Sequence, residues 1–228
     1  MEYARTVFGI EWDLPSPRFN IGPNQIVPIF VLDTEAKPVA TVARWNLIPS
    51  FAAGSPDAYL RTNARAEEVL TKPSYREAIQ QRRCLVPADG FYEWEHLHGG
   101  RVKLPWAFEL PERRPFTFAG LWERGGETRP PSFTILTTRP NELVAQIHNR
   151  MPVMLADEAA HRWLAPGPMT REILAPFAEP FPAGQMRSYR VNPILNSVRQ
   201  ESAEAAAPAT AEQLARTDPA SSGQGELF

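Results

Sequence analysis

Glu93 is the residue of this chain with the clearest potential for acid–base chemistry. It stands among three aromatic residues in the run Phe91-Tyr92-Glu93-Trp94, which follows Pro87 and the turn signal Asp89-Gly90. Because alternate strand residues share a face, the side chain of Glu93 would point to one face of the strand, and those of Tyr92 and Trp94 would point to the other. Two interpretations stay open. Glu93 is either a solvated strand residue, or a carboxylate in an aromatic-walled cleft where burial would raise its pKa towards that of a general acid or base.

Two further segments place an arginine beside another polar side chain. Asn63 and Arg65 would begin a helix, where free backbone N–H groups favour an anion such as phosphate. The alternative is an ordinary N-cap at Asn63 and a solvated Arg65. His148 and Arg150 would close another helix. There His148 either interacts with the C-terminal carbonyl groups or, with its near-neutral pKa, carries protons beside a phosphate-binding Arg150.

The remaining candidates are aromatic residues and one thiol. Trp45 and Phe51 bracket a proline-bent loop, where aromatic rings either pack into a core or stack on bases. Cys84 is the single cysteine, which excludes an internal disulfide, and we expect its thiol to be buried in a strand. The four histidines show no zinc-ligand spacing, so we predict no metal site and no cofactor.

Composition favours one soluble domain with a charged tail. The 228 residues are 43% hydrophobic, and no run approaches the roughly 20 apolar residues of a membrane span. The N-terminus also lacks a signal-peptide pattern, so we expect an intracellular protein. Residues 201–228 contain five acids against one base, whereas residues 1–200 contain 23 bases and 21 acids. The bases are 21 Arg and 3 Lys, which fits a nucleic-acid groove and equally fits a GC-rich genome.

The hydrophobic pattern predicts short strands, many loops and few helices. Prolines interrupt short apolar runs with β-branched and aromatic residues, which is typical of a largely antiparallel sheet folded into a barrel or sandwich. We expect residues 201–228 to be disordered or loosely helical. The expected strands are 26–32, 39–45, 84–86, 91–95, 106–110, 116–122, 133–138 and 186–191. The expected helices are 64–70, 75–81, 142–148, 158–164 and 169–177.

Five blocks of the sequence resemble, in this order, the signature blocks of one family. They are ARWNLIPS at 43–50, NARAE at 63–67, RRCLVPADGFYEW at 82–94, AGLWE at 119–123 and IHNRMP at 147–152. Segments 17–23 and 191–193 also fit its flanking regions. Over about residues 17–200 the chain thus resembles the SOS-response-associated peptidase (SRAP) family, the abasic-site processing proteins.

The resemblance implies a single α+β domain with a largely antiparallel, β-barrel-like core and peripheral short helices. This domain would span residues 1–200, followed by the acidic, Ala-rich tail 201–228. It would present a positive groove to single-stranded DNA, abasic DNA and junctions between single and double strands. A monomer in the cytoplasm, associated with the nucleoid and without a membrane partner, fits that activity.

The resemblance also assigns roles to particular residues. Asn63 would hold the deoxyribose or its ring oxygen, Glu93 would shuttle protons at the amine and aldehyde, and His148 would assist ring opening and crosslink reversal. A second group would hold phosphates or stack on bases. Its members are Arg65, Arg150, Trp45, Phe51 and Arg83.

The N-terminus departs from the family pattern. Members begin Met-Cys-Gly-Arg and crosslink abasic DNA as a thiazolidine on the exposed cysteine, whereas this chain begins Met1-Glu2. Cys84 lacks the free α-amine that a thiazolidine needs, and Glu2 should leave Met1 in place, so we predict no stable crosslink. The α-amine of Met1, with a pKa of about 8, could still form a reversible imine with the aldehyde and support β-elimination.

Several hypotheses about the function therefore stay open. We favour a divergent SRAP-type protein that retains the DNA groove. A second hypothesis is that the natural protein starts upstream and has cysteine at its second position. A third is a non-catalytic interaction module whose acidic tail engages partners. Hydrolysis of a peptide by Cys84 and His148 is a further alternative.

Overall fold

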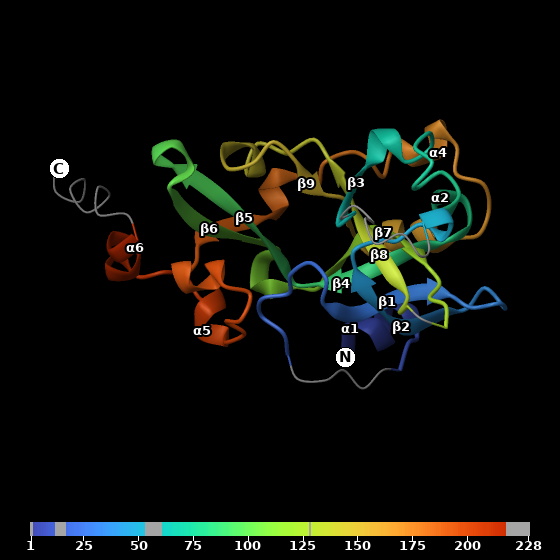
Figure 1. Ribbon diagram of the computed structural model, residues 1–228, viewed down its shortest axis with the longest axis horizontal. Helices are drawn as coiled ribbons and strands as arrows, with labels where there is room; N and C mark the ends of the chain where they lie inside the picture. The colour runs from blue at the N-terminus through green and yellow to red at the C-terminus, as the bar shows by residue number, and fades with distance from the viewer. Residues whose placement is uncertain (1, 12–16, 53–60, 128, 218–228) are drawn as a thin grey trace.

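A ring of hydrogen-bonded strands forms the centre of the molecule (Figure 1). The computed structural model describes residues 2–11, 17–52, 61–127 and 129–217. Within these residues β7 pairs with β4, β4 with β1, β1 with β2 and β2 with β8, and β8 pairs back with β7. The β2–β8 pair is parallel and the others in the ring are antiparallel. These strands are β1 (Ile26–Leu32), β2 (Pro38–Trp45), β4 (Arg83–Ala88), β7 (Phe116–Glu123) and β8 (Ser132–Thr138).

Three short strands attach to this ring. β3 (Asn63–Arg65) runs parallel to β8, and β9 (Met151–Pro152) pairs antiparallel with β8. β10 (Met154–Leu155) pairs with β7. Thr137 of β8 faces Arg65 of β3 on one side and Pro152 of β9 on the other. Through this register, the NARAE and IHNRMP segments lie on either side of the same strand.

A second, three-stranded sheet carries the hairpin that contains Glu93. It has the order β11 (Arg187–Arg190), β6 (Val102–Glu109) and β5 (Gly90–Leu97), all antiparallel. Figure 1 shows the β5–β6 hairpin projecting from the ring, with α5 and α6 beside it. β5 begins at Gly90. Glycine suits this position because the Cβ of any other residue would lie 3.0 Å from the carbonyl oxygen of Phe108. The Asp89-Gly90 turn therefore passes the chain from one sheet to the other instead of closing a hairpin with β4.

The ring packs against two apolar cores, one on each face of its strands. In β1, Val27, Ile29 and Val31 enter the core that also contains Phe108 and Phe118, whereas Phe30 enters the other core. This alternation is what a strand with period two requires. Helices cover the second core. They are α1 (Glu2–Phe8), α2 (Ala78–Gln81), α3 (Asp157–Leu164) and α4 (Arg171–Leu174).

The strands and the mixed α/β composition agree with the expectation, but two expected helices do not form. Residues 63–65 form strand β3, and only Ala66–Glu68 turns into a 3-10 helix, because the backbone of this segment pairs with β8. The segment 142–148 contains only the 3-10 helix Val144–Gln146. The other 3-10 helices are Ser50–Ala52, His98–Gly100, Pro111–Arg113, Ala183–Gln185 and η7 (Pro193–Asn196).

The remaining expected helices are shorter than predicted or begin nearby. The 75–81 segment contains α2, and the 169–177 segment contains α4, where Thr170 Oγ1 accepts a hydrogen bond of 3.3 Å from the Ile173 N–H. α3 covers the expected 158–164 and begins one residue earlier. Its Trp163 is fully buried and donates from Nε1 to the carbonyl oxygen of Cys84 at 3.0 Å, which fixes α3 against β4.

The described part of the tail is helical and packs on the second sheet. α5 (Ala203–Ala206) buries Ala205 in a small core with Ala107, Val191 and Leu195. Glu201 forms an ion pair with Arg18, and α6 (Ala211–Thr217) follows. Within residues 201–217, Ala203–Ala206 and Ala211–Thr217 are helical, and residues 218–228 lie outside the described part of the chain.

Candidate functional site

Glu93 lies on β5 directly opposite Trp106 of β6, and its side chain is 21% exposed. Burial raises the pKa of Glu93 from 4.5 to about 7, and the positive charge that His148 can carry acts in the opposite direction. A carboxyl group with this pKa exchanges its proton near neutral pH. The geometry thus supports the buried, acid–base interpretation of Glu93 over the solvated one.

His148 is the partner that the structure brings to Glu93. Nδ1 of His148 lies 3.7 Å from Oε1 of Glu93, within ion-pair distance but too far for a direct hydrogen bond. The same Nδ1 lies 3.2 Å from the Arg150 N–H and 3.1 Å from the Arg150 carbonyl oxygen. His148 is 44% exposed at its side chain, so a substrate can reach the ring from solvent. Together the two residues form a pair that can hold and transfer one proton.

Asn63 and Arg65 are exposed on the same face of β3, two residues apart. Asn63 is therefore not a helix cap, which corrects the expectation for that residue. The preceding residue, Thr62, accepts a hydrogen bond of 2.7 Å at its carbonyl oxygen from Trp45 Nε1. Arg65 lies 3.7 Å from Glu68, and its side chain is 61% exposed, so its guanidinium is accessible to a phosphate.

Arg150 is held on the protein itself. Its Nη1 and Nη2 donate to the two carboxylate oxygens of Glu67 at 2.8 and 2.9 Å, and Nη2 also donates to the Thr137 carbonyl oxygen at 2.7 Å. The hydrogen bond from Arg150 contributes to holding the pKa of Glu67 below its usual value, although burial acts to raise it. Glu67 belongs to the NARAE segment, and its place in the sequence indicates no role for it.

The structure corrects the expectation that Arg83 binds DNA. Its side chain is buried and donates to five backbone carbonyl groups, two of them Trp163 at 2.7 Å and Ile79 at 2.8 Å. Burial also lowers the pKa of Arg83. This guanidinium joins β4 to the ends of α2 and α3, so it is not available to a phosphate.

Cys84 is buried, as predicted. Its side chain lies so close to Gly120 that a Cβ there would be 2.8 Å from Sγ, and burial raises the pKa of the thiol well above its usual value. A buried, protonated thiol is a poor nucleophile. The structure therefore opposes a hydrolase that uses Cys84 and His148.

The two aromatic candidates differ in accessibility. The ring of Trp45 stacks on Phe133 with 6.4 Å between centroids, and its N–H is bonded to Thr62, so Trp45 has mainly a packing role. Phe51, in contrast, is 66% exposed. Its side chain is open to contact with a base.

Met1 lies outside the described residues. The helix that follows it, α1, buries Ala4 and Phe8 in the core covered by α2, α3 and α4, and Tyr3 donates to Asp157 at 3.0 Å. Figure 1 shows α1 on the side of the ring away from β3 and β9. The first described turn of the chain thus packs apart from the candidate site.

A row of side chains that the sequence did not reveal continues from Glu93 across the second sheet. Strand register places Glu93, Trp106 and Arg190 directly opposite one another on three adjacent strands. The guanidinium of Arg190 lies 5.2 Å from the Trp106 ring centroid, and Glu95 accepts hydrogen bonds of 3.0 Å from both residues. Only the register between distant strands could have revealed this row.

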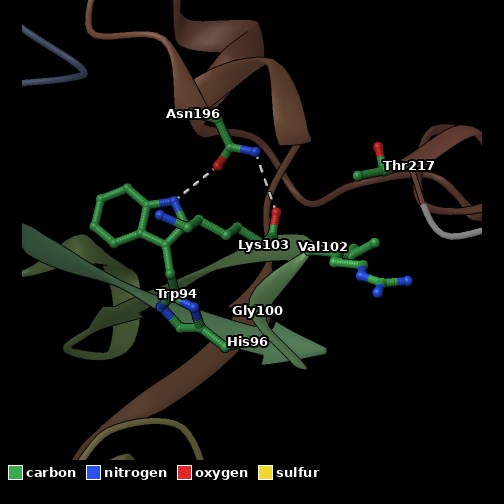
Figure 2. Close-up of a pocket in the computed structure, with 8 residues that line it drawn as sticks. Trp94, His96, Gly100, Val102, Lys103, Asn196 and Thr217 are labelled. Atoms are coloured by element: carbon green, nitrogen blue, oxygen red, sulfur yellow. Dashed lines mark hydrogen bonds between the residues drawn. The ribbon is translucent and has the colours of Figure 1, made fainter. Parts of the chain in front are cut away.

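A cavity of about 480 Å³ lies at the other face of the same hairpin. In Figure 2, Asn196 bridges its wall, accepting from Trp94 Nε1 at 2.8 Å and donating to the Lys103 carbonyl oxygen at 3.1 Å. Trp94 follows Glu93 in the strand, so the two side chains point to opposite faces. This cavity is therefore separate from the Glu93–His148 pair, and Asn196 attaches η7 to the hairpin.

Among the described residues, no group of three or more His, Cys, Asp and Glu side chains could hold a metal ion. The described helices also include none long and apolar enough to cross a membrane.

The sequence model of the family described as SOS response associated peptidase (SRAP) matches residues 4–198. The chain belongs to the SRAP family. One relative, named abasic site processing protein YoqW of Bacillus subtilis, is 37% identical over 204 residues, which cover 86% of this chain and 90% of the relative. The SRAP family thus includes relatives named for abasic-site processing.

More distant relatives of this SRAP protein extend to animals and to solved structures. The abasic site processing protein HMCES of Gallus gallus is 32% identical, and the match covers 84% of this chain and 66% of that protein. An X-ray structure of a protein from Bacteroides thetaiotaomicron superposes with a TM-score of 0.71 at 28% identity, covering 82% of each chain. The fold described above is therefore shared with a solved structure.

Proposed function

We propose that this SRAP protein binds abasic sites in single-stranded DNA, including single strands at junctions with a duplex, and processes the sugar with Glu93 and His148. The observation that carries the proposal is the 3.7 Å approach of His148 Nδ1 to Glu93 Oε1, with the pKa of Glu93 at about 7. Such a pair supplies an acid and a base at the same pH. The names of the relatives supply the substrate class.

The reaction that this pair fits is opening of the abasic sugar ring. The abasic deoxyribose is mainly a cyclic hemiacetal, and its reactive form is the open aldehyde. Protonated Glu93 gives its proton to the ring oxygen as the C1′–O4′ bond breaks, and neutral His148 takes the proton of the C1′ hydroxyl group. The proton then returns from His148 to Glu93, and the aldehyde is formed without any net change in the protein.

DNA would reach the pair along β3. The exposed side chains of Asn63 and Arg65 share one face of this strand, and β3 pairs with the same strand as β9, next to His148. Asn63 would hold the sugar or its ring oxygen, Arg65 would bind a phosphate, and exposed Phe51 would stack on a base.

The single thiol of this sequence is not available as the nucleophile of a covalent step. Cys84 is internal and buried, so it does not form a thiazolidine. An imine needs only an amine and the opened aldehyde, so it is the covalent product that fits this chemistry. We therefore propose binding and ring opening as the core activity, with an imine as its covalent extension.

The test is incubation of the full chain with an abasic single-stranded oligonucleotide, followed by denaturing electrophoresis with and without borohydride. We expect binding that prefers the abasic oligonucleotide, and any adduct to depend on borohydride, which traps an imine. Arg65→Ala should weaken binding and reduce its salt dependence by about one phosphate contact, whereas Arg171→Ala on α4 should not. The proposal would be overturned if the wild-type chain bound the abasic oligonucleotide no more tightly than Arg65→Ala does and showed no preference for the abasic site.

A further inference from the structure

The side chain of Arg150 has little capacity left for a DNA phosphate. Of its five N–H groups, both on Nη2 are donated, to Glu67 and to the Thr137 carbonyl oxygen, and one on Nη1 is donated to Glu67. Nε is buried and has no hydrogen-bond partner in the part of the chain that the structure describes. A phosphate could bind this guanidinium in a bidentate manner only by displacing the Glu67 carboxylate.

The backbone of Arg150, in contrast, faces the catalytic histidine. Its N–H and its carbonyl oxygen lie 3.2 and 3.1 Å from Nδ1 of His148. When the ring is neutral at Nδ1, this nitrogen accepts from the N–H; when Nδ1 is protonated, it donates to the carbonyl oxygen. The backbone of Arg150 can therefore hold the imidazole in both protonation states, which a proton-transferring residue requires.

We propose that Glu67 is a positioning residue: it fixes the Arg150 side chain against Thr137 of β8, and the backbone of Arg150 in turn holds the His148 ring opposite Glu93. The connection is continuous, from the Glu67 carboxylate to the Arg150 guanidinium, to the Arg150 backbone, to Nδ1 of His148. Thr137 anchors it to the ring of strands, because its carbonyl oxygen accepts from Nη2 at 2.7 Å.

The exposure of Glu67 argues for such a geometric role. Its side chain is 55% exposed, and ion pairs in that setting contribute little to stability. A bidentate contact does, however, fix the plane of the guanidinium, which a single hydrogen bond does not. The expected consequence of losing Glu67 is therefore a misplaced His148 in a protein that remains folded.

The catalytic meaning of this positioning rests on the proposed function, but its test does not. The test is an NMR titration of the Glu93 carboxyl group and the His148 ring in the full chain without DNA. In Glu67→Gln, we expect the titration midpoint of Glu93 to rise by about one pH unit, since an oppositely charged neighbour at this distance contributes that much and would move away. Arg150→Lys, which keeps the charge but loses the bidentate contact, should do the same.

Glu68→Gln is the matched control. It removes the same charge from the adjacent residue, but Glu68 pairs with Lys72 and Arg65 and not with Arg150. In Glu68→Gln, the titration midpoint of Glu93 should stay at the wild-type value. Unchanged midpoints in Glu67→Gln, or an equal shift in Glu68→Gln, would overturn the proposal. So would tighter binding of a single-stranded oligonucleotide by Glu67→Gln with unchanged midpoints, because Arg150 would then be a phosphate ligand that Glu67 masks.

Discussion

Glu93 combines two properties that usually exclude each other in a folded protein: it is largely buried, and within the described residues it has no hydrogen-bonded cationic partner. His148 at 3.7 Å offsets part of the cost of its charge, and burial still raises the pKa of Glu93 to about 7. Such a residue destabilises the protein when it is ionised. A carboxyl group that costs stability at neutral pH is a mark of a functional position.

Replacing Glu93 by Gln should therefore stabilise the protein at high pH. The folded state binds the Glu93 proton more tightly than the unfolded state, so the wild-type free energy of unfolding falls as pH rises from 4.5 to about 7. Glu93→Gln removes this loss, which is at most about 3 kcal/mol above pH 7, and the difference should vanish below pH 4.5. Urea unfolding across this range measures it. A difference between the two proteins that does not change with pH would contradict the assignment.

For single residues, the sequence predicted the acid–base candidates but not the residues that hold them in place. Glu93 and His148 were predicted and lie together, whereas Arg83 was assigned to DNA and is buried. Arginine is usually exposed, and only the fold brings the carbonyl groups of Trp163 and Ile79 around this one. Glu67 was overlooked because its partner, Arg150, lies 83 positions away in the sequence.

Arg83 connects strand β4 to the ends of helices α2 and α3, so its loss should destabilise the fold. Arg83→Ala would leave the carbonyl groups at the ends of α2 and α3 without their donor, which should cost about 2–4 kcal/mol of stability. Urea unfolding measures the loss. Affinity for single-stranded DNA, measured where the variant is fully folded, should equal that of the wild type. Weaker binding with unchanged stability would restore Arg83 to the DNA interface.

Element types were predictable where the pattern was strong and failed where tertiary pairing decided. The strand at 26–32 has the expected bounds, because its apolar residues alternate between two cores. The segment 63–67 has the residues of a helix start, yet it forms β3, since β8 offers a free edge for hydrogen bonds. Pairing of this kind overrides a weak local propensity, and it exposes Asn63 and Arg65 on one face.

For the whole molecule, the tail is part of the folded structure at least as far as residue 217. Ala205 is buried with Ala107, Val191 and Leu195, whereas Ala207 of the same segment is exposed. Ala205→Gln should therefore lower the thermal midpoint by several degrees, the shift expected for about 1–2 kcal/mol, and Ala207→Gln should leave it unchanged. Equal midpoints for the two variants would mean that the tail contributes nothing to the stability of the fold.

Opening of the abasic sugar can be measured without any nucleophile on the protein. At a saturating concentration of an alkoxyamine, capture of the aldehyde of an abasic single-stranded oligonucleotide is limited by ring opening. The wild-type chain should accelerate this capture near pH 7, and Glu93→Gln and His148→Ala should each lose the acceleration by roughly 10²-fold or more while still binding the oligonucleotide. A capture rate that is the same with wild-type protein, with either variant and with no protein would rule out ring opening by Glu93 and His148.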